Sequence, residues 1–233
     1  MPRTPAAILL DVGGVFLLPS HDHILGALAR AGQHTGDSDA IDRAHYVATR
    51  AFPMDLDGTE DMSSHWNLYL HMYAEELGVA EDTRDQTVEH LRNEFVSGAL
   101  WSRIIAGSRQ GLDDLVATDV PIGIVSNADG TIESRLRSMG LLQVGPGRGV
   151  EVRCLVDSGK VGVEKPDPTI FDHALDALGV RPEQTWYVGD TPAFDVVGAR
   201  RAGIHPILMD PFEVNRDLGV DCVASLAEVA ALI

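Results

Sequence analysis

The stretch AAILLDVGGV, residues 6–15, places a single carboxylate at the end of a short apolar run. Short, continuous apolar runs that lead into a turn are typical of strands buried in a parallel sheet. Asp11 follows this run directly, and Gly13 and Gly14 let backbone N–H groups approach an anion closely. The stretch therefore predicts a buried strand that delivers Asp11 as a candidate nucleophile, next to a candidate anion-binding loop.

Three later apolar runs also end in polar clusters. Amphipathic helical patterns over residues 131–140 and 168–179 lie between them. This alternation predicts an α/β fold, with a Rossmann-like parallel sheet and helices on both faces. Sites in such sheets form at the carboxyl ends of the strands, so we expect the polar clusters to converge there. The three runs are VPIGIV before Ser126, QTWYV before Gly189 and Asp190, and HPILM before Asp210.

The segment from residue 17 to residue 105 breaks this alternation. It carries successive helical patterns and no convincing strand, which predicts an all-helical subdomain inserted after the first strand. The core would then comprise residues 1–16 and 106–233, with hinges near residues 17 and 105. The helical patterns cover residues 21–32, 37–52, 63–78 and 83–96.

The charge balance restricts the class of partner. The chain has 18 basic and 35 acidic residues, a net charge of −17, and a field of that sign repels nucleic acid and anionic membranes. No apolar run approaches the roughly 18 residues of a membrane span. We therefore expect a cytoplasmic protein, a monomer or a homodimer, that binds neither nucleic acid nor membrane. A phosphorylated substrate would need a local positive centre, such as a metal ion or one of the two lysines, Lys160 and Lys165.

The polar clusters contain the groups that phosphoryl transfer requires: an ionised oxygen nucleophile, a divalent cation, and donors to the nonbridging oxygens. Lys165, in the rigid frame EKPDP, offers a fixed cation, and Ser126 and Asn127 offer a hydroxyl and an amide N–H. Asp190 and Asp195, together with the nucleophile, offer the hard oxygen ligands that Mg²⁺ prefers.

Four motifs in this order resemble the haloacid dehalogenase-like hydrolase superfamily. They are DVGGV at 11–15, SNADG at 126–130, KPDP at 165–168 and GDTPAFD at 189–195. The 115 positions between the first two motifs are similar to the spacing in members that carry a helical cap after the first strand.

The resemblance implies a mobile cap over a Rossmann-like core, and hydrolysis of a small phosphorylated molecule through an aspartyl-phosphate on Asp11. It also implies a Mg²⁺ cofactor. The ion would be held by the carboxylates of Asp11 and Asp190 and the backbone carbonyl of Gly13, with Asp195 in or just behind that set. Ser126, Asn127 and Lys165, with the backbone of Gly13 and Gly14, would bind the transferring group.

The chain departs from the family pattern at Gly13, where phosphatases usually carry a second aspartate that protonates the leaving group. One alternative is a substitute acid from the start of the insert: His21, Asp22 or His23. Another is a substrate whose leaving group needs little protonation. Some phosphatase-like members also have Asp-x-Gly at this point, which favours these two alternatives.

Two other classes of function stay open at this stage. In a 2-haloacid dehalogenase a halide leaves without a proton. Those enzymes work without a metal ion, however, and the pair Asp190 and Asp195 favours a metal-dependent protein. A catalytically weak protein that binds a phosphorylated ligand, or regulates a partner, is the second class. The phosphatase remains the favoured function.

A second aspartate motif, DLDGT at 55–59, also matches the nucleophile signature of the superfamily. Asp55 follows a helical pattern and Pro53 rather than an apolar strand, and an Asp-Gly pair is common in turns. We therefore do not expect Asp55 to be the nucleophile, although the loop stays a candidate for contact with substrate.

Candidates in the insert for substrate contact are His65, Trp66, Tyr69 and Asp57. The helical spacing of Trp66, Leu70 and Leu77 instead favours packing within the insert.

Overall fold

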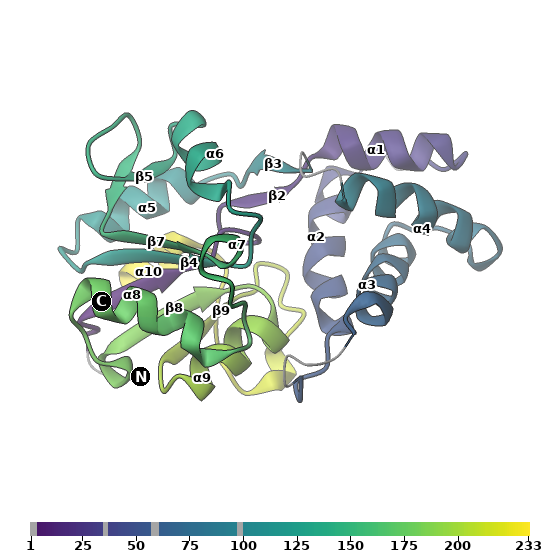
Figure 1. Ribbon diagram of the computed structural model, residues 1–233. Coiled ribbons are helices and arrows are strands. Elements are labelled where there is room, and N and C mark those ends of the chain that lie inside the picture. Colours follow the sequence, from purple (N-terminus) through teal and green to yellow (C-terminus); the bar gives the residue numbers. More distant parts are fainter. Residues whose placement is uncertain (1–3, 35–36, 57–60, 97–99) are drawn as a thin grey trace.

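The computed structural model describes residues 4–34, 37–56, 61–96 and 100–233. At its centre is a parallel sheet of six strands in the order β10-β9-β8-β1-β4-β7 (Figure 1). The strands are β1 (Ala7–Leu10), β4 (Ile122–Ser126), β7 (Cys154–Asp157), β8 (Thr185–Gly189), β9 (His205–Met209) and β10 (Asp221–Val223). The predicted α/β fold with a parallel sheet is confirmed, and the four apolar runs form strands β1, β4, β8 and β9.

Strand β1 lies between β8 and β4, and its register decides where the site forms. Leu10 is level with Val188 of β8 and with Ile124 of β4. The residues that follow these strands therefore leave the sheet at the same edge. Every residue of β1 is buried, as expected for a central strand covered on both faces.

Helices cover both faces of the sheet, and the side chains of β1 alternate between them. Ile8 and Leu10 pack in an apolar cluster with residues of α5, α6 and α10, whereas Leu9 packs in another with residues of α8 and α9. These helices are α5 (Ser108–Val116), α6 (Ile132–Ser138), α8 (Asp172–Leu178), α9 (Val197–Arg201) and α10 (Leu226–Ala231).

A helical unit, α1–α4, stands beside the carboxyl edge of the sheet (Figure 1). Its helices pack around a separate apolar cluster that includes Leu28, Tyr73 and Leu91. The bounds are α1 (His21–Arg30), α2 (Ser38–Ala48), α3 (Ser63–Glu76) and α4 (Glu81–Phe95), with a 3-10 turn η1 (Thr49–Ala51) after α2. Within the described ranges, no helix combines the length and the apolar character needed to cross a membrane.

The expectation that residues 17–105 contain no strand is wrong at both ends of the segment. Strand β2 (Leu17–Pro19) pairs antiparallel with β3 (Trp101–Ile104) and joins the helical unit to the sheet. Strands of three or four residues give too short an alternation to be recognised in a sequence, and their pairing depends on residues more than 80 positions apart.

Candidate active site

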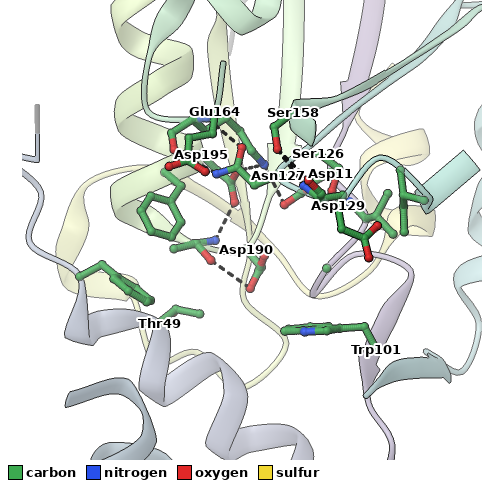
Figure 2. A pocket seen from close by; sticks show the side chains of 18 of the residues that line it. Asp11, Thr49, Trp101, Ser126, Asn127, Asp129, Ser158, Glu164, Asp190 and Asp195 are labelled. Carbon is green, nitrogen blue, oxygen red and sulfur yellow. Dashed lines mark hydrogen bonds and ion pairs between the residues drawn. The ribbon is translucent and has the colours of Figure 1, made fainter. Parts of the chain in front are cut away.

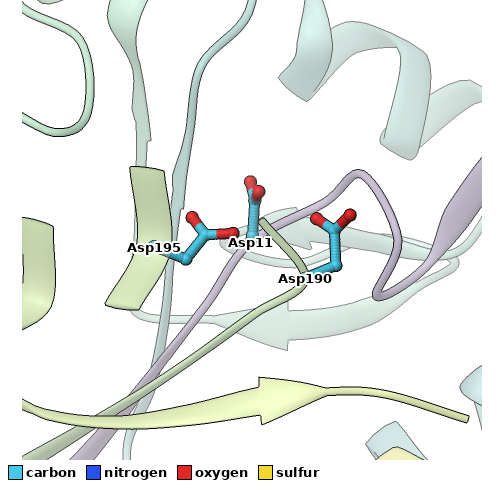
Figure 3. A group of neighbouring side chains, drawn as sticks. All are labelled: Asp11, Asp190 and Asp195. Carbon is cyan, nitrogen blue, oxygen red and sulfur yellow. The ribbon is translucent and has the colours of Figure 1, made fainter. Parts of the chain in front are cut away.

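Three buried aspartates meet at the carboxyl edge of the sheet (Figure 3). Asp11 follows β1, Asp190 follows β8, and Asp195 lies in a π-helical turn, η4 (Pro192–Val196). One ligand atom from each side chain lies within 4.8 Å of the others, so the cluster can hold a metal ion. The sheet register thus brings together the three carboxylates that the sequence singled out.

Lys165 lies between two of these carboxylates. Its Nζ is 2.9 Å from Asp11 Oδ2, 2.7 Å from Asp195 Oδ1 and 2.7 Å from the hydroxyl oxygen of Tyr187. Burial lowers the pKa of Lys165, but the carboxylates of Asp11 and Asp195 raise it, and the net shift is upward. The ammonium group therefore stays charged and holds Asp11 and Asp195 in place.

The electrostatics of Asp11 indicate that the cluster can accept more positive charge. Burial raises the pKa of Asp11 to about 6; Lys165 opposes the rise, while Asp195 and Asp190 add to it. One lysine thus faces three carboxylates in a buried site. All the side-chain atoms of the cluster that could bind a metal are hard carboxylate oxygens, a set suited to a divalent cation such as Mg²⁺ or Ca²⁺. The residues present fit the metal that the sequence predicted.

Asn127 has a different set of contacts from the predicted one. Its side-chain Oδ1 accepts a hydrogen bond from the backbone N–H of Lys165 at 2.8 Å, and its Nδ2 donates to the backbone carbonyl of Lys165 at 3.0 Å. The side-chain amide is therefore a clamp on the lysine main chain, whereas we expected it to donate to the transferring group. Ser126, at the end of β4, is buried and lines the same cavity (Figure 2).

The structural setting of glycine differs between positions 13 and 14. Gly14 has φ +62°, and a Cβ there would lie 2.2 Å from Cγ of Asp190, so only glycine fits. The backbone of Gly13 lies outside the left-handed region, and a Cβ there would contact the indole of Trp101, with 3.5 Å to Cζ3. The hydroxyl of Tyr46 donates to the carbonyl of Gly14 at 2.7 Å.

The aspartates open into a cavity of about 880 Å³ between the sheet edge and the helical unit. Figure 2 shows Thr49 and Trp101 on the side of the cavity opposite to Ser126 and Asn127. Six aromatic side chains are among the residues that line it: Phe52, Trp66, Tyr69, Phe95, Trp101 and Phe194.

His45 is a site residue that the sequence did not reveal. It lies on α2, is 3% exposed, and its Nε2 is 2.7 Å from Asp190 Oδ2. Its Nδ1 is 2.7 Å from the hydroxyl oxygen of Tyr69. The tautomer with hydrogen on Nε2 satisfies both contacts, because it donates to the carboxylate and accepts from the tyrosine. The helical pattern around His45 carries no signal that this histidine faces an aspartate 145 positions later.

The three candidate substitute acids are not among the described residues that line the cavity. His21 Nε2 is 2.7 Å from Asp42, His23 Nδ1 is 2.6 Å from Glu94, and Asp22 is exposed in the first turn of α1. Both histidines thus pair with carboxylates of α2 and α4 within the helical unit. The structure does not bring any of the three to the aspartate cluster.

The DLDGT motif lies only partly within the described residues. Asp55 is exposed in a turn, whereas Leu56 is buried and lines the cavity. Asp57, the candidate for substrate contact, lies outside the described residues.

Of the other insert candidates, Tyr69 and Trp66 line the cavity, and His65 is not among the described lining residues. The preference for packing was wrong for Trp66, which is 42% exposed, and correct for Leu70 and Leu77, which are buried.

The sequence matches the family described as haloacid dehalogenase-like hydrolase over residues 41–209. It is 46% identical to a phosphoserine phosphatase of Thermus thermophilus over 67 residues, 29% of this chain and 27% of that protein. It is 31% identical to haloacid dehalogenase-like hydrolase domain-containing protein 3 of Danio rerio over 126 residues, 54% of this chain and 49% of that protein. The chain thus matches at most half the length of these relatives.

The fold is similar to that of a dehalogenase crystallised with an intermediate complex. The TM-score is 0.59 at 19% identity, over 100% of this chain and 99% of that chain. At this identity the likeness concerns the fold alone. Because the family match covers well over half of the residues, and its motifs meet at one edge of the sheet, the chain belongs to the haloacid dehalogenase-like hydrolases.

Proposed function

We propose that this protein is a Mg²⁺-dependent phosphohydrolase that cleaves a small phosphorylated molecule through an aspartyl-phosphate on Asp11. One observation carries the proposal: the carboxylates of Asp11, Asp190 and Asp195 form one buried cluster, and Lys165 bridges two of them. A phosphoryl group needs an ionised nucleophile and concentrated positive charge, and this cluster can supply both. The relative named phosphoserine phosphatase supports the same reaction class.

Each residue has a defined role in this reaction. An Asp11 oxygen attacks phosphorus while the bond from phosphorus to the leaving oxygen breaks, and the electron pair departs on that oxygen, which takes its proton from solvent. Lys165 holds Asp11 in line and balances charge on the transferring group. Asn127 fixes the lysine main chain, and Ser126 contacts the phosphoryl oxygens. Water then attacks the aspartyl-phosphate, which releases phosphate and restores the Asp11 carboxylate.

The metal would be held by the carboxylates of Asp11, Asp190 and Asp195 with the carbonyl of Gly13. When bound, Mg²⁺ supplies positive charge to the phosphoryl oxygens. An added divalent charge would offset the burial that raises the pKa of Asp11, so that this carboxylate is ionised beside the metal.

We assign residues 17–105 to a cap and residues 1–16 and 106–233 to the catalytic core. The cavity supports this division, since its lining combines aspartates from the strand ends with side chains of the helical unit. Water exclusion by such a cover strengthens every charge interaction around Asp11.

The test is phosphate release from a panel of phosphorylated metabolites with Mg²⁺, run on the native protein, Asp11→Asn and Asp55→Asn. We expect Asp11→Asn to abolish turnover and Asp55→Asn to leave it largely intact. Equal loss in both variants, or greater loss in Asp55→Asn, would mean that Asp11 is not the nucleophile.

Two further measurements separate the other classes. Hydrolysis of a 2-haloacid that survives a chelator would favour the dehalogenase. Binding of phosphorylated ligands without any covalent phosphate on Asp11 would favour a binding or regulatory protein.

A further inference from the structure

The indole of Trp101 covers the position where family phosphatases carry their general acid. A Cβ on Gly13 would lie 3.5 Å from Cζ3 and 3.8 Å from Cε3 and Cη2 of this ring. The backbone of Gly13 does not itself demand glycine, and a Cβ there would be in ordinary van der Waals contact with the ring. Arg135 secures this position, because its guanidinium donates to the Trp101 carbonyl at 2.8 Å. An indole ring thus lies beside the position from which a proton donor would be expected to extend.

Trp101 is one end of a continuous aromatic wall, which we define as Trp101, Phe95, Tyr69, Trp66, Phe52 and Phe194. Neighbouring rings have centroid distances from 4.8 Å, for Phe52 and Phe194, to 6.5 Å, for Phe95 and Trp101. All six side chains line the cavity, and the side chain of Trp66 is 42% exposed. Phe52 and Tyr69 are buried, whereas the other four rings are at least partly exposed. A partly exposed aromatic surface beside a candidate catalytic cluster is typical of a ligand site for an apolar group.

Several polar groups of the described lining are engaged with protein partners. Lys165 is held by Asp11 and Asp195, and Arg135 by the Trp101 carbonyl. The hydroxyl of Tyr69 bonds to His45. A sugar or amino-acid leaving group packed against the ring faces of this wall would lose hydrogen bonds to water there.

From these observations, and resting on the proposed phosphohydrolase function, we infer that the substrate is an aromatic phosphate with an acidic leaving oxygen, such as an aryl phosphate or an aroyl phosphate. The aromatic ring packs on the wall, and the phosphoryl group faces Asp11. Asp11 forms the new P–O bond while the bond to the leaving oxygen breaks. The electron pair departs on a phenolate or aromatic carboxylate, which is stable without a proton. Water then cleaves the aspartyl-phosphate.

The discriminating experiment compares kcat/KM for benzoyl phosphate and acetyl phosphate in the presence of Mg²⁺. Both are acyl phosphates with weakly basic leaving groups, and they differ in the ring. Burial of a ring on the wall predicts a preference of at least about tenfold for benzoyl phosphate. Phenyl phosphate and 4-nitrophenyl phosphate form a second arm, which separates an aryl from an aroyl substrate.

Variants of the wall test whether the preference arises there. Trp101→Ala and Trp66→Ala should lower the benzoyl-to-acetyl ratio at least about threefold, and Trp101→Phe should keep most of it. The matched control is Leu68→Ala: Leu68 is 48% exposed on the same helix as Trp66 and is not among the described lining residues, so the ratio should not change.

Binding gives a readout that does not depend on turnover or on how Trp101→Ala folds. Phenylphosphonate should bind the native protein with Mg²⁺ at least about tenfold more tightly than methylphosphonate, measured by calorimetry. Equal affinities, together with equal kcat/KM for the two acyl phosphates, would overturn the inference. If acetyl phosphate is still cleaved in an Asp11-dependent manner, the proposed function survives that result. If no phosphate is released from either compound, the proposed function fails first, and this inference with it.

Discussion

The imidazole of His45 reaches from helix α2 to the carboxylate at the end of β8, where its Nε2 lies 2.7 Å from Asp190 Oδ2. Both side chains are almost fully buried, and the other ring nitrogen contacts the hydroxyl of Tyr69. A residue of the helical unit thus orients an aspartate of the proposed metal cluster. The hydrogen bond links the position of that unit to the geometry of the site.

Replacement of His45 should impair the metal site without removing a ligand. For His45→Ala we expect about a 10- to 100-fold loss of kcat/KM, with half-saturation at a higher Mg²⁺ concentration, because Asp190 loses its donor. Titration of phosphate release with Mg²⁺ measures both effects. His71→Ala on α3 is the control, since His71 lies near the exposed Asp85 and is not among the described residues of the cavity. An unchanged Mg²⁺ dependence in His45→Ala would contradict the assignment.

The clamp on Lys165 should be essential for turnover although Asn127 does not touch the phosphoryl group in our assignment. Asn127→Ala removes two hydrogen bonds to the lysine main chain, and we expect kcat to fall at least about tenfold, because small displacements of catalytic groups are costly. The rate of phosphate release under saturating Mg²⁺ measures kcat. Asn67→Ala on α3 is the control, and its kcat should equal that of the native protein. A normal kcat in Asn127→Ala would rule out this positioning role.

The parts of the site that could be predicted from the sequence lie on the strands of the sheet. The run before Asp11 and the run before Asp190 are both fully buried strands, and a parallel sheet necessarily brings their carboxyl ends to one edge. Lys165 could be placed for a related reason, because its motif resembles one that the family carries at this edge. Local pattern and a general rule of sheet topology were sufficient for Asp11 and Asp190, whereas Lys165 also needed the resemblance to the family.

The parts that could not be predicted are contacts between the helical unit and the sheet edge. His45 and Trp101 sit in a helix and in a very short strand, and neither local pattern says which element faces the aspartates. The choice of His21, Asp22 and His23 as possible substitute acids rested on proximity along the chain to the first strand, and none of the three is among the described residues that line the cavity. Packing between elements distant in sequence decides such contacts.

The stability of the metal-free protein should improve when Asp11 loses its charge. The pKa of Asp11 is raised from 3.8 to about 6 in the folded state, so its ionisation favours the unfolded chain as pH rises. This cost is absent below about pH 4 and complete above about pH 6, where it reaches about 3 kcal/mol. Asp11→Asn should therefore gain stability relative to the native protein between pH 4 and pH 7.

Denaturant unfolding with a chelator present, at pH 4 and pH 7, measures this difference. Added Mg²⁺ should then stabilise the native protein more than Asp11→Asn. A variant that loses stability relative to the native protein as pH rises would show that Asp11 is stabilised as a carboxylate without metal.

A restored general acid should work only where Trp101 makes room for it. Gly13→Asp alone places a carboxylate against the indole, so we expect no gain with alkyl phosphates, whose leaving groups need a proton. On such esters the double variant Gly13→Asp, Trp101→Ala should have a kcat/KM at least about tenfold higher than that of Trp101→Ala alone. General acids contribute about 10² to 10⁴ in rate. Measured kcat/KM for a small alkyl phosphate decides this, and an equal gain in the single variant would show that the ring is no obstacle.

The central place of β1 has a consequence for the order of events during synthesis. Strand β1, which leads into Asp11, precedes the other described strands in the chain, yet its two neighbours in the sheet are residues 122–126 and 185–189. Contacts of this sequence separation form slowly, whereas α1–α4 have their mutual contacts by residue 95. In a nascent chain α1–α4 can therefore assemble long before Asp11 meets Asp190, and the proposed site forms only after residues 185–189 have been made.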